Sequence, residues 1–115
     1  MNTSNPSWFN GFPGAITICD AQGILIDMND KAAETLREDG GRALIGKNIL
    51  DCHPEPSKSK LKAMMEKRES NTYTIEKKGV KKLIYQSPIY TGGEYAGFIE
   101  LSLEIPFEMS HFVRD

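Results

Sequence analysis

Hydrophobic and polar positions alternate most regularly in the stretch FIELSLEI, residues 98–105. Side chains of a β-strand point alternately to its two faces, so residues two apart share a face. The alternation therefore predicts a strand with one apolar face and one largely polar face. The apolar face holds Ile99, Leu101, Leu103 and Ile105, and the other holds Phe98, Glu100, Ser102 and Glu104.

The residues before this stretch predict two more strands. NTYTIEKKGVKKLIYQSPIY, residues 71–90, favours strands on either side of KKG, because Tyr73 and Ile75 alternate with polar neighbours and a glycine permits a tight turn. TGGEYAG, residues 91–97, is typical of the next turn. The second half of the chain is therefore predicted to form three consecutive strands.

A hairpin is predicted where the regular pattern begins. AITICD (15–20) and ILIDM (24–28) are short runs rich in β-branched residues, and AQG separates them. Asp20 is placed to accept hydrogen bonds from the turn backbone, and Gly23 supplies a permissive backbone angle.

Helical signals fill the region between the hairpin and the three strands. Asn29 is a good N-cap for a helix over residues 30–39, which Gly40-Gly41 ends. Residues 43–52 favour one or two brief helical turns. Pro54 and Pro56 then break the chain. After them, Ser57 is suited to cap a helix that carries Leu61, Met64 and Met65 on one face.

This order of elements predicts an α+β fold with an antiparallel sheet. The last three strands lack the crossover helices that a parallel sheet requires. Five strands with short helices gathered on one face leave a layer that the helices cannot fully close, which is a natural place for a small-ligand pocket.

Composition narrows the class of protein. The chain has 115 residues and a formal net charge of −2, which is typical of one globular domain with no bulk attraction to nucleic acid or anionic lipid. No apolar run approaches the roughly 20 residues that span a bilayer, and no signal peptide is evident, so we expect a cytoplasmic protein. We divide it into an N-terminal extension (1–14), a folded domain (15–105) and a C-terminal tail (106–115).

The segments AITICDAQGILIDMNDKAAETL, LIGKNILD and the final FIELSLEI after GGEYAG resemble a PAS domain over residues 15–105. In that family an Asp-x-x-Gly hairpin leads to an Asn-capped helix. The resemblance implies a five-stranded antiparallel sheet with short helices and one longer helix on one face. It also implies a sensory or protein-interaction role in signal transduction, and no catalysis by the domain.

The segment Cys52-His53-Pro54 has two interpretations. Some PAS domains bind haem through a histidine close to this position, and PAS modules attached to hemerythrin-like bacterial proteins carry a similar Cys-His-Pro, so His53 is a candidate iron ligand of a gas or redox sensor. Alternatively, Cys52 fills an apolar gap, His53 bonds a carbonyl of the preceding turn, and the prolines set the bend. The cysteine and histidine spacing does not favour a zinc site or a catalytic pair.

The sequence also bears on a flavin cofactor and on a small ligand held in a pocket. Light-sensing PAS relatives carry Gly-x-Asn-Cys, whereas this chain has GKNI with Ile49 at the cysteine position, which disfavours a flavin photoadduct. Leu61, Met64 and Met65 are candidate lining residues of a ligand pocket, with simple core packing as the alternative.

Aromatic and apolar residues in both tails predict an interface. Large apolar side chains on the tails of a small domain need cover. We expect a homodimer formed by the N-terminal extension and the outer sheet face, to which we assign Phe98 and either Ile84 or Tyr85; packing within one chain is the alternative. The residues concerned are Trp8, Phe9, Phe12, Phe107, Met109, Phe112 and Val113.

Overall fold

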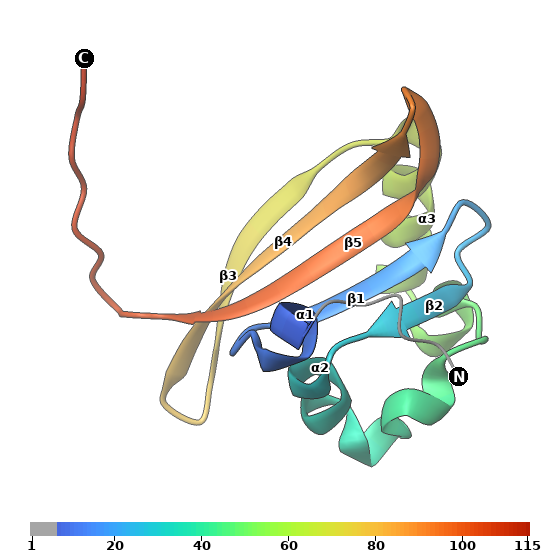
Figure 1. Ribbon diagram of the computed structural model, residues 1–115, viewed down its shortest axis with the longest axis horizontal. Helices are drawn as coiled ribbons and strands as arrows, with labels where there is room; N and C mark the ends of the chain where they lie inside the picture. Colours follow the sequence, from blue (N-terminus) through green and yellow to red (C-terminus); the bar gives the residue numbers. More distant parts are fainter. Residues whose placement is uncertain (1–6) are drawn as a thin grey trace.

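A computed structural model of the chain describes residues 7–115 (Figure 1). The predicted α+β class and the five-stranded antiparallel sheet are confirmed, with the strand order β2-β1-β5-β4-β3. No helix in this range is long and apolar enough to cross a membrane. The elements are α1 Ser7–Gly11, β1 Ala15–Asp20, β2 Leu25–Met28, α2 Asp30–Thr35, the 3₁₀ turns η1 Arg37–Asp39, η2 Gly41–Leu44 and η3 Ile49–Cys52, α3 Ser57–Lys67, β3 Asn71–Lys77, β4 Val80–Thr91 and β5 Glu94–Ile105.

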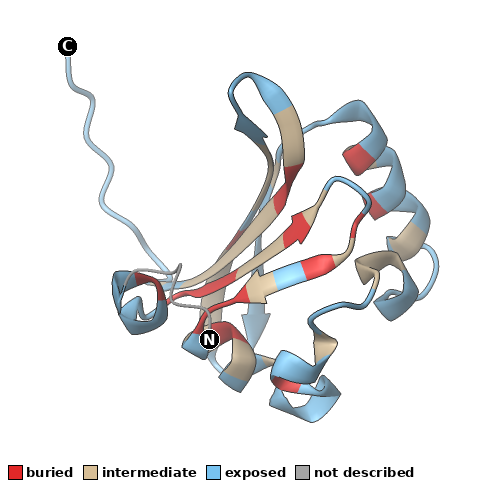
Figure 2. Ribbon diagram, turned by 45° about the vertical axis from the view of Figure 1, so that its right-hand side comes forward, coloured by how far each residue is buried: buried red, intermediate tan, exposed pale blue. Residues whose placement is uncertain are grey.

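The helices α2 and α3 and the 3₁₀ turns lie on one face of the sheet, which we call the inner face. Two clusters of buried side chains join the layers, and the buried positions are coloured red along the ribbon in Figure 2. At the α2 end Ala15 packs with Leu25, Met28 and Ala32, and at the α3 end Cys19 and Phe98 pack with Leu61 and Met65. Ile49 packs against both clusters and so connects them.

The β1–β2 turn forms as the sequence predicts. Asp20 Oδ1 accepts hydrogen bonds from the backbone N–H groups of Gln22 and Ile24 at 2.9 and 3.0 Å. Gly23 has a φ of +87°, a conformation that costs a glycine little because it has no Cβ. This turn positions Cys19 and Leu25 side by side beneath the helices.

Asn29 is the predicted N-cap of α2 and also ties the N-terminal segment to the sheet. Its Oδ1 accepts hydrogen bonds from the N–H groups of Ala32 and Ile16, both at 3.0 Å, and its Nδ2 donates to the Gly14 carbonyl at 2.8 Å. The side chain is fully buried. The helix is shorter than predicted, because residues 37–39 tighten into a 3₁₀ turn and Gly40 and Gly41 adopt positive φ angles that reverse the chain.

The start of α3 corrects one expectation. Ser57 is not its cap; Pro56 occupies the N-cap position and makes no side-chain cap bond. Instead Glu55 accepts hydrogen bonds from the Ser59 hydroxyl and the Ser59 N–H, and these bonds lower the pKa of the Glu55 carboxyl. A carboxylate next to a helix start is favoured by the positive end of the helix dipole.

The three C-terminal strands form as predicted, except that β5 begins earlier. Glu94 and Tyr95 already pair with β4, so the turn is confined to Gly92 and Gly93. The assignment of Phe98 to the outer sheet face is wrong, because Phe98 is buried against α3. Its partners by alternation, Glu100 and Ser102, therefore face inward too, and the apolar set of β5 faces outward.

Candidate functional site

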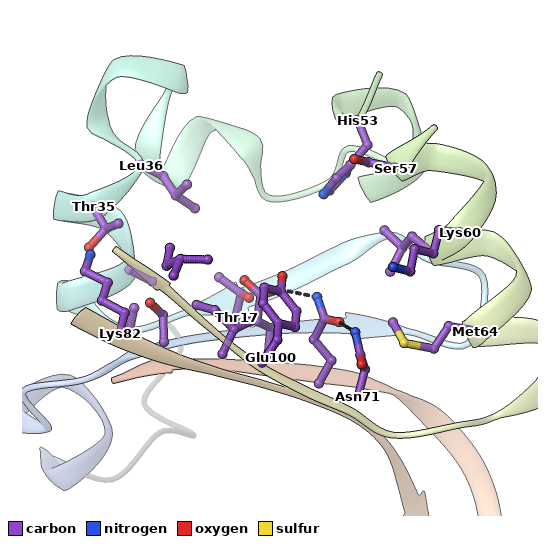
Figure 3. Close-up of a pocket in the computed structure, with 18 of the residues that line it drawn as sticks. Thr17, Thr35, Leu36, His53, Ser57, Lys60, Met64, Asn71, Lys82 and Glu100 are labelled. Atoms are coloured by element: carbon purple, nitrogen blue, oxygen red, sulfur yellow. Dashed lines mark hydrogen bonds between the residues drawn. The ribbon is translucent and has the colours of Figure 1, made fainter. Parts of the chain in front are cut away.

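A cavity of two adjoining lobes, of about 570 and about 1010 Å³, lies between the inner face and the helices. Ligand pockets in proteins commonly have volumes of about 300–1,000 Å³. Figure 3 shows the sheet as the floor, α2 and α3 as the side walls, and His53 with Ser57 opposite the floor. The residues common to both lobes are Thr17, Leu36, His53, Leu61, Gln86 and Glu100.

The floor of the cavity is one polar row across the sheet. Thr17 of β1 pairs with Glu100 of β5, Glu100 pairs with Gln86 of β4, and Gln86 pairs with Asn71 of β3. Residues opposite each other in antiparallel strands place their side chains close together on the same face. The sequence separates these four residues by up to 83 positions, yet the register aligns them.

Hydrogen bonds connect this row from the sheet edge to the centre. Asn71 Nδ2 donates to Gln86 Oε1 at 3.3 Å, and Gln86 Nε2 donates to Glu100 Oε1 at 2.7 Å. The dashed lines in Figure 3 mark these bonds. Both amides are thus oriented toward the carboxylate, which fixes the side chains on the floor.

The Glu100 carboxylate brings negative charge into the cavity. It is partly buried, and among residues 7–115 no ion pair reaches it. Its effect on the surroundings is visible at Tyr73, whose pKa is raised first by desolvation and then by the charge of Glu100. Tyr73 lies one row away, on β3.

The candidate residues Leu61 and Met64 line the α3 side of the cavity, and Leu36 lines the side of α2 (Figure 3). Met65 lies elsewhere: it packs into the buried cluster with Cys19 and Phe98. The walls combine these apolar side chains with the polar side chains of Thr35, Ser57 and Lys60, above a polar floor. Such a site can bind an apolar body and orient one polar group.

His53 lines both lobes, at the bend between η3 and α3. Its Nδ1 lies 2.6 Å from the carbonyl oxygen of Ile49, so this nitrogen carries the proton and donates it. The predicted bond to a carbonyl of the preceding turn is present. The lone pair of Nε2 remains available to a ligand.

Cys52 does not fill an apolar gap, as one interpretation expected, because it is exposed. Its thiol lies 3.8 Å from the carbonyl oxygen of Asn48. The buried thiol is Cys19, and burial raises the pKa of Cys19 to about 11. Within residues 7–115 no group of three or more His, Cys, Asp or Glu is arranged to hold a metal ion.

His53 has the chemistry of a haem iron ligand. Its Nδ1–H donates to a backbone carbonyl, an arrangement that favours metal ligation by the other nitrogen. The floor does not fit, however. A porphyrin is a broad apolar disc, and it would strip water from the Glu100 carboxylate and the Gln86 amide without supplying a cation. The residues present therefore favour a smaller and more polar ligand.

Sequence reasoning missed Glu100, Gln86 and Asn71 as site residues. A signal was present for Glu100, since it belongs to the polar set of FIELSLEI. Nothing in the sequence indicated that this set, rather than the apolar one, faces the helices.

The outer face of the sheet is the apolar one. Tyr85 pairs with Leu101 there, whereas Ile84 faces the cavity, which settles the open choice between Ile84 and Tyr85. Gly14 lies against Leu103 and Phe12, so the N-terminal extension covers one end of this face. Trp8 and the tail residues Phe107, Met109, Phe112 and Val113 remain more than half exposed.

Comparison with solved structures identifies this arrangement. The PAS domain of BvgS from Bordetella pertussis aligns with a TM-score of 0.63 at 20% identity, over 85% of this chain and 81% of that one. The chain has the PAS fold. The PAS-like fold predicted from the Asp-x-x-Gly hairpin and the final strand is thus confirmed.

Two further PAS-fold neighbours come from Vibrio cholerae. A sensory box sensor histidine kinase gives a TM-score of 0.64 at 19% identity, over 84% of this chain and 85% of that one. The Aer2 receptor, a dual PAS-heme oxygen sensor, gives 0.61 at 18% identity, over 81% and 95%. No family model and no curated protein matches the sequence.

Proposed function

We propose that this PAS domain is a non-catalytic sensory module in signal transduction that binds a small polar ligand in the inner cavity. The observation that carries the proposal is the hydrogen-bonded polar row Thr17, Glu100, Gln86 and Asn71, set in the floor of a cavity whose walls are partly apolar. Buried polar groups cost free energy unless they are satisfied, so a row of them facing a cavity suits a ligand that completes their bonds.

Two solved neighbours support the sensory role by analogy of fold. One is a sensor histidine kinase and the other is an oxygen receptor. A fold alone does not determine function, so the argument rests on the site itself.

The same strands connect the cavity to the outer face. Glu100 lies between Ile99 and Leu101 in β5, and alternation places those neighbours on the opposite side of the sheet. A ligand that changes the hydrogen bonds of Glu100 changes the position of β5 relative to β4. The apolar outer face is therefore the natural output surface.

We further propose that two copies pair through this outer face together with the N-terminal extension (1–14). Trp8 is 64% exposed, and Leu101 and Leu103 have no helix above them beyond the end that the extension covers. Aromatic and aliphatic side chains of this kind contribute most of the binding energy in protein interfaces. Phe9 is buried within its own chain, so for this residue the alternative, packing within one chain, is the better account.

Catalysis is not part of the proposal. A cysteine nucleophile needs a histidine base within hydrogen-bonding reach. Here the His53 Nδ1 bonds the Ile49 carbonyl, and the Cys52 thiol lies against the Asn48 carbonyl. The division into residues 1–14, 15–105 and 106–115, the cytoplasmic location and the lack of a nucleic-acid partner stay predictions.

Native mass spectrometry of freshly purified protein tests both parts of the proposal. We expect a dimer whose mass exceeds that of two chains by a small molecule, and we expect collisional activation to release that molecule. Monomers that carry no adduct, even after incubation with a cell extract, would contradict the proposal.

The alternative function is a haem-binding gas or redox sensor with His53 as the iron ligand. Titration of the protein with haem, followed by absorption spectroscopy, distinguishes it. Because the carboxylate floor does not fit a porphyrin, we expect no Soret band specific to the wild type. A Soret band that His53→Ala abolishes would establish the alternative instead.

A further inference from the structure

The Glu100 carboxylate lies at a partly buried position, where folded proteins usually supply a side chain of opposite charge. It is partly buried on the floor of the cavity, and within residues 7–115 its side chain accepts one hydrogen bond, from Gln86 Nε2 at 2.7 Å. The ion pairs within residues 7–115 are Lys31–Glu34 and Arg42–Asp30, both at the surface. A charge withdrawn from water is stabilised by a partner of opposite charge, and no residue in the described range 7–115 forms an ion pair with Glu100.

The hydrogen bonds of the floor also have a direction. Asn71 donates to the Gln86 amide oxygen, and Gln86 in turn donates to Glu100, so the row ends at the carboxylate. Glu100 Oε2 is left with acceptor capacity, because an ionised carboxylate has two oxygens and no donor. The centre of the floor therefore accepts a hydrogen-bond donor from the cavity and offers no proton in return.

We propose that the ligand of this cavity is a small organic monocation, a primary amine or guanidinium compound whose charged nitrogen binds Glu100. This inference rests on the proposed function, since it names the class of ligand for the same site. Charge-assisted hydrogen bonds between an N–H cation and a carboxylate are about twice as strong as neutral ones. They become stronger still where water is partly excluded, as it is between the sheet and α3.

The walls define the rest of the molecule. Leu61 and Met64 on the α3 side and Leu36 on the opposite side present aliphatic and thioether surface above the floor. A methionine adapts its shape to an irregular apolar group. The ligand therefore carries an unbranched or compact apolar body next to its charged nitrogen.

The rim limits the ligand to one positive charge. Lys60 from α3 and Lys82 from β4 both line the same lobe, on opposite sides of the cavity in Figure 3. A second ammonium group at the far end of the ligand approaches these lysines, and like charges repel. Diamines are thus disfavoured relative to monoamines of the same length.

Isothermal titration calorimetry of the full chain at pH 7 tests this inference with four probes of equal carbon number: n-hexylamine, n-hexanol, hexanoate and 1,6-diaminohexane. We expect hexylamine to bind most tightly, with the alcohol about tenfold or more weaker because it forms only a neutral hydrogen bond. Hexanoate and the diamine should bind more weakly than hexylamine.

Two matched variants localise the effect. Glu100→Gln keeps the shape and removes the charge, and it should weaken hexylamine binding about tenfold to hundredfold while leaving hexanol binding unchanged. Glu104→Gln makes the same chemical change four residues along the strand, outside the lining of both lobes, and should leave hexylamine binding as in the wild type. The comparison of probes on the wild-type protein needs no variant, so it decides the question even if Glu100→Gln fails to fold.

The outcomes separate this inference from the function on which it rests. Tighter binding of hexanol or hexanoate than of hexylamine would overturn the monocation inference and leave the ligand-binding function standing. Equal loss of hexylamine affinity in both variants would also overturn it. Absence of binding by all four probes would overturn the inference and would weaken the proposed function as well.

Discussion

The two faces of the sheet differ in β4 and β5, where a polar row lies under the helices and apolar side chains lie on the open face. An antiparallel sheet covered on one side commonly turns its apolar residues toward the cover and its polar residues toward water. In β4 and β5 the face under the helices carries Gln86, Glu100 and Ser102 between the buried Ile84 and Phe98, while the open face carries Leu101 and Leu103. This arrangement is the basis of the two proposals above: a polar ligand inside and an apolar partner surface outside.

The largest expected effect follows from loss of the Asn29 side chain, which links Gly14, β1 and α2. Asn29→Ala removes the bonds to Ile16 and Ala32 and leaves the Gly14 carbonyl without its donor. We expect a loss of about 3 kcal/mol in the free energy of unfolding, because each abandoned buried group costs about 1 kcal/mol or more. Urea denaturation measures it. Asn10→Ala, at an exposed position of α1, is the control and should change the stability by less than about 0.5 kcal/mol.

The next largest effect is on dimer dissociation and comes from a substitution on the outer face alone. Leu101→Glu puts a charge at the centre of the proposed dimer surface and should raise the dissociation constant at least about a hundredfold, since a desolvated unpaired charge is costly. Sedimentation velocity over a range of concentrations measures it. Lys62→Gln changes the net charge equally on α3, on the inner side of the sheet, and should leave association intact. If both variants associate as the wild type does, the outer face is not the interface.

A pH effect reports on the inner side. The folded protein holds the pKa of Cys19 at about 11, against an ordinary value of 9.0, so the unfolded chain loses this proton first. The contribution of Cys19 to the free energy of unfolding should thus be constant below pH 9 and fall between pH 9 and 11. Burial also raises the pKa of the neighbouring Tyr95, which lowers stability in the same direction. Cys19→Ala should remove the cysteine part of the fall, whereas Cys52→Ala, at an exposed thiol, should leave it unchanged.

The smallest expected effect shows whether the N-terminal extension contributes to the proposed dimer interface in addition to the sheet. Trp8→Ala alters a mostly exposed side chain, so the stability of one chain should barely change, while dimer dissociation should increase about tenfold if Trp8 lies in the interface. Phe9 is unsuitable for this test because it is buried and its removal would unfold the extension. Unchanged sedimentation of Trp8→Ala would confine the interface to the strands.

Local signals allowed much of the fold to be predicted. Asp20 and Gly23 act within one turn, and Asn29 caps the helix that follows it, so their effects depend on residues nearby in the chain. Ser57 was misassigned as a cap because Glu55, two residues earlier, bonds Ser59 instead. Such competition between neighbouring caps is decided by backbone geometry, which the sequence does not specify.

The site was harder to predict than the fold. Alternation shows which residues of a strand share a face, but it does not show which face lies under the helices. Phe98 was therefore placed outside, and Glu100 was not recognised as a site residue. The partners of Glu100, Gln86 and Asn71, depend on the register of three strands. His53, Leu61 and Met64 could be predicted to line the cavity because their signals are local: a proline break in the chain and a helical spacing.

The central claim is that the inner face binds the ligand and the outer face does not. Methyl-selective NMR of the protein titrated with n-hexylamine tests it most directly, since Leu61 and Met64 report on the cavity while Leu101 and Leu103 report on the opposite face. We predict saturable shifts at Leu61 and Met64, with Leu101 and Leu103 unchanged. Saturable shifts at Leu101 and Leu103, with Leu61 and Met64 unmoved, would contradict the account.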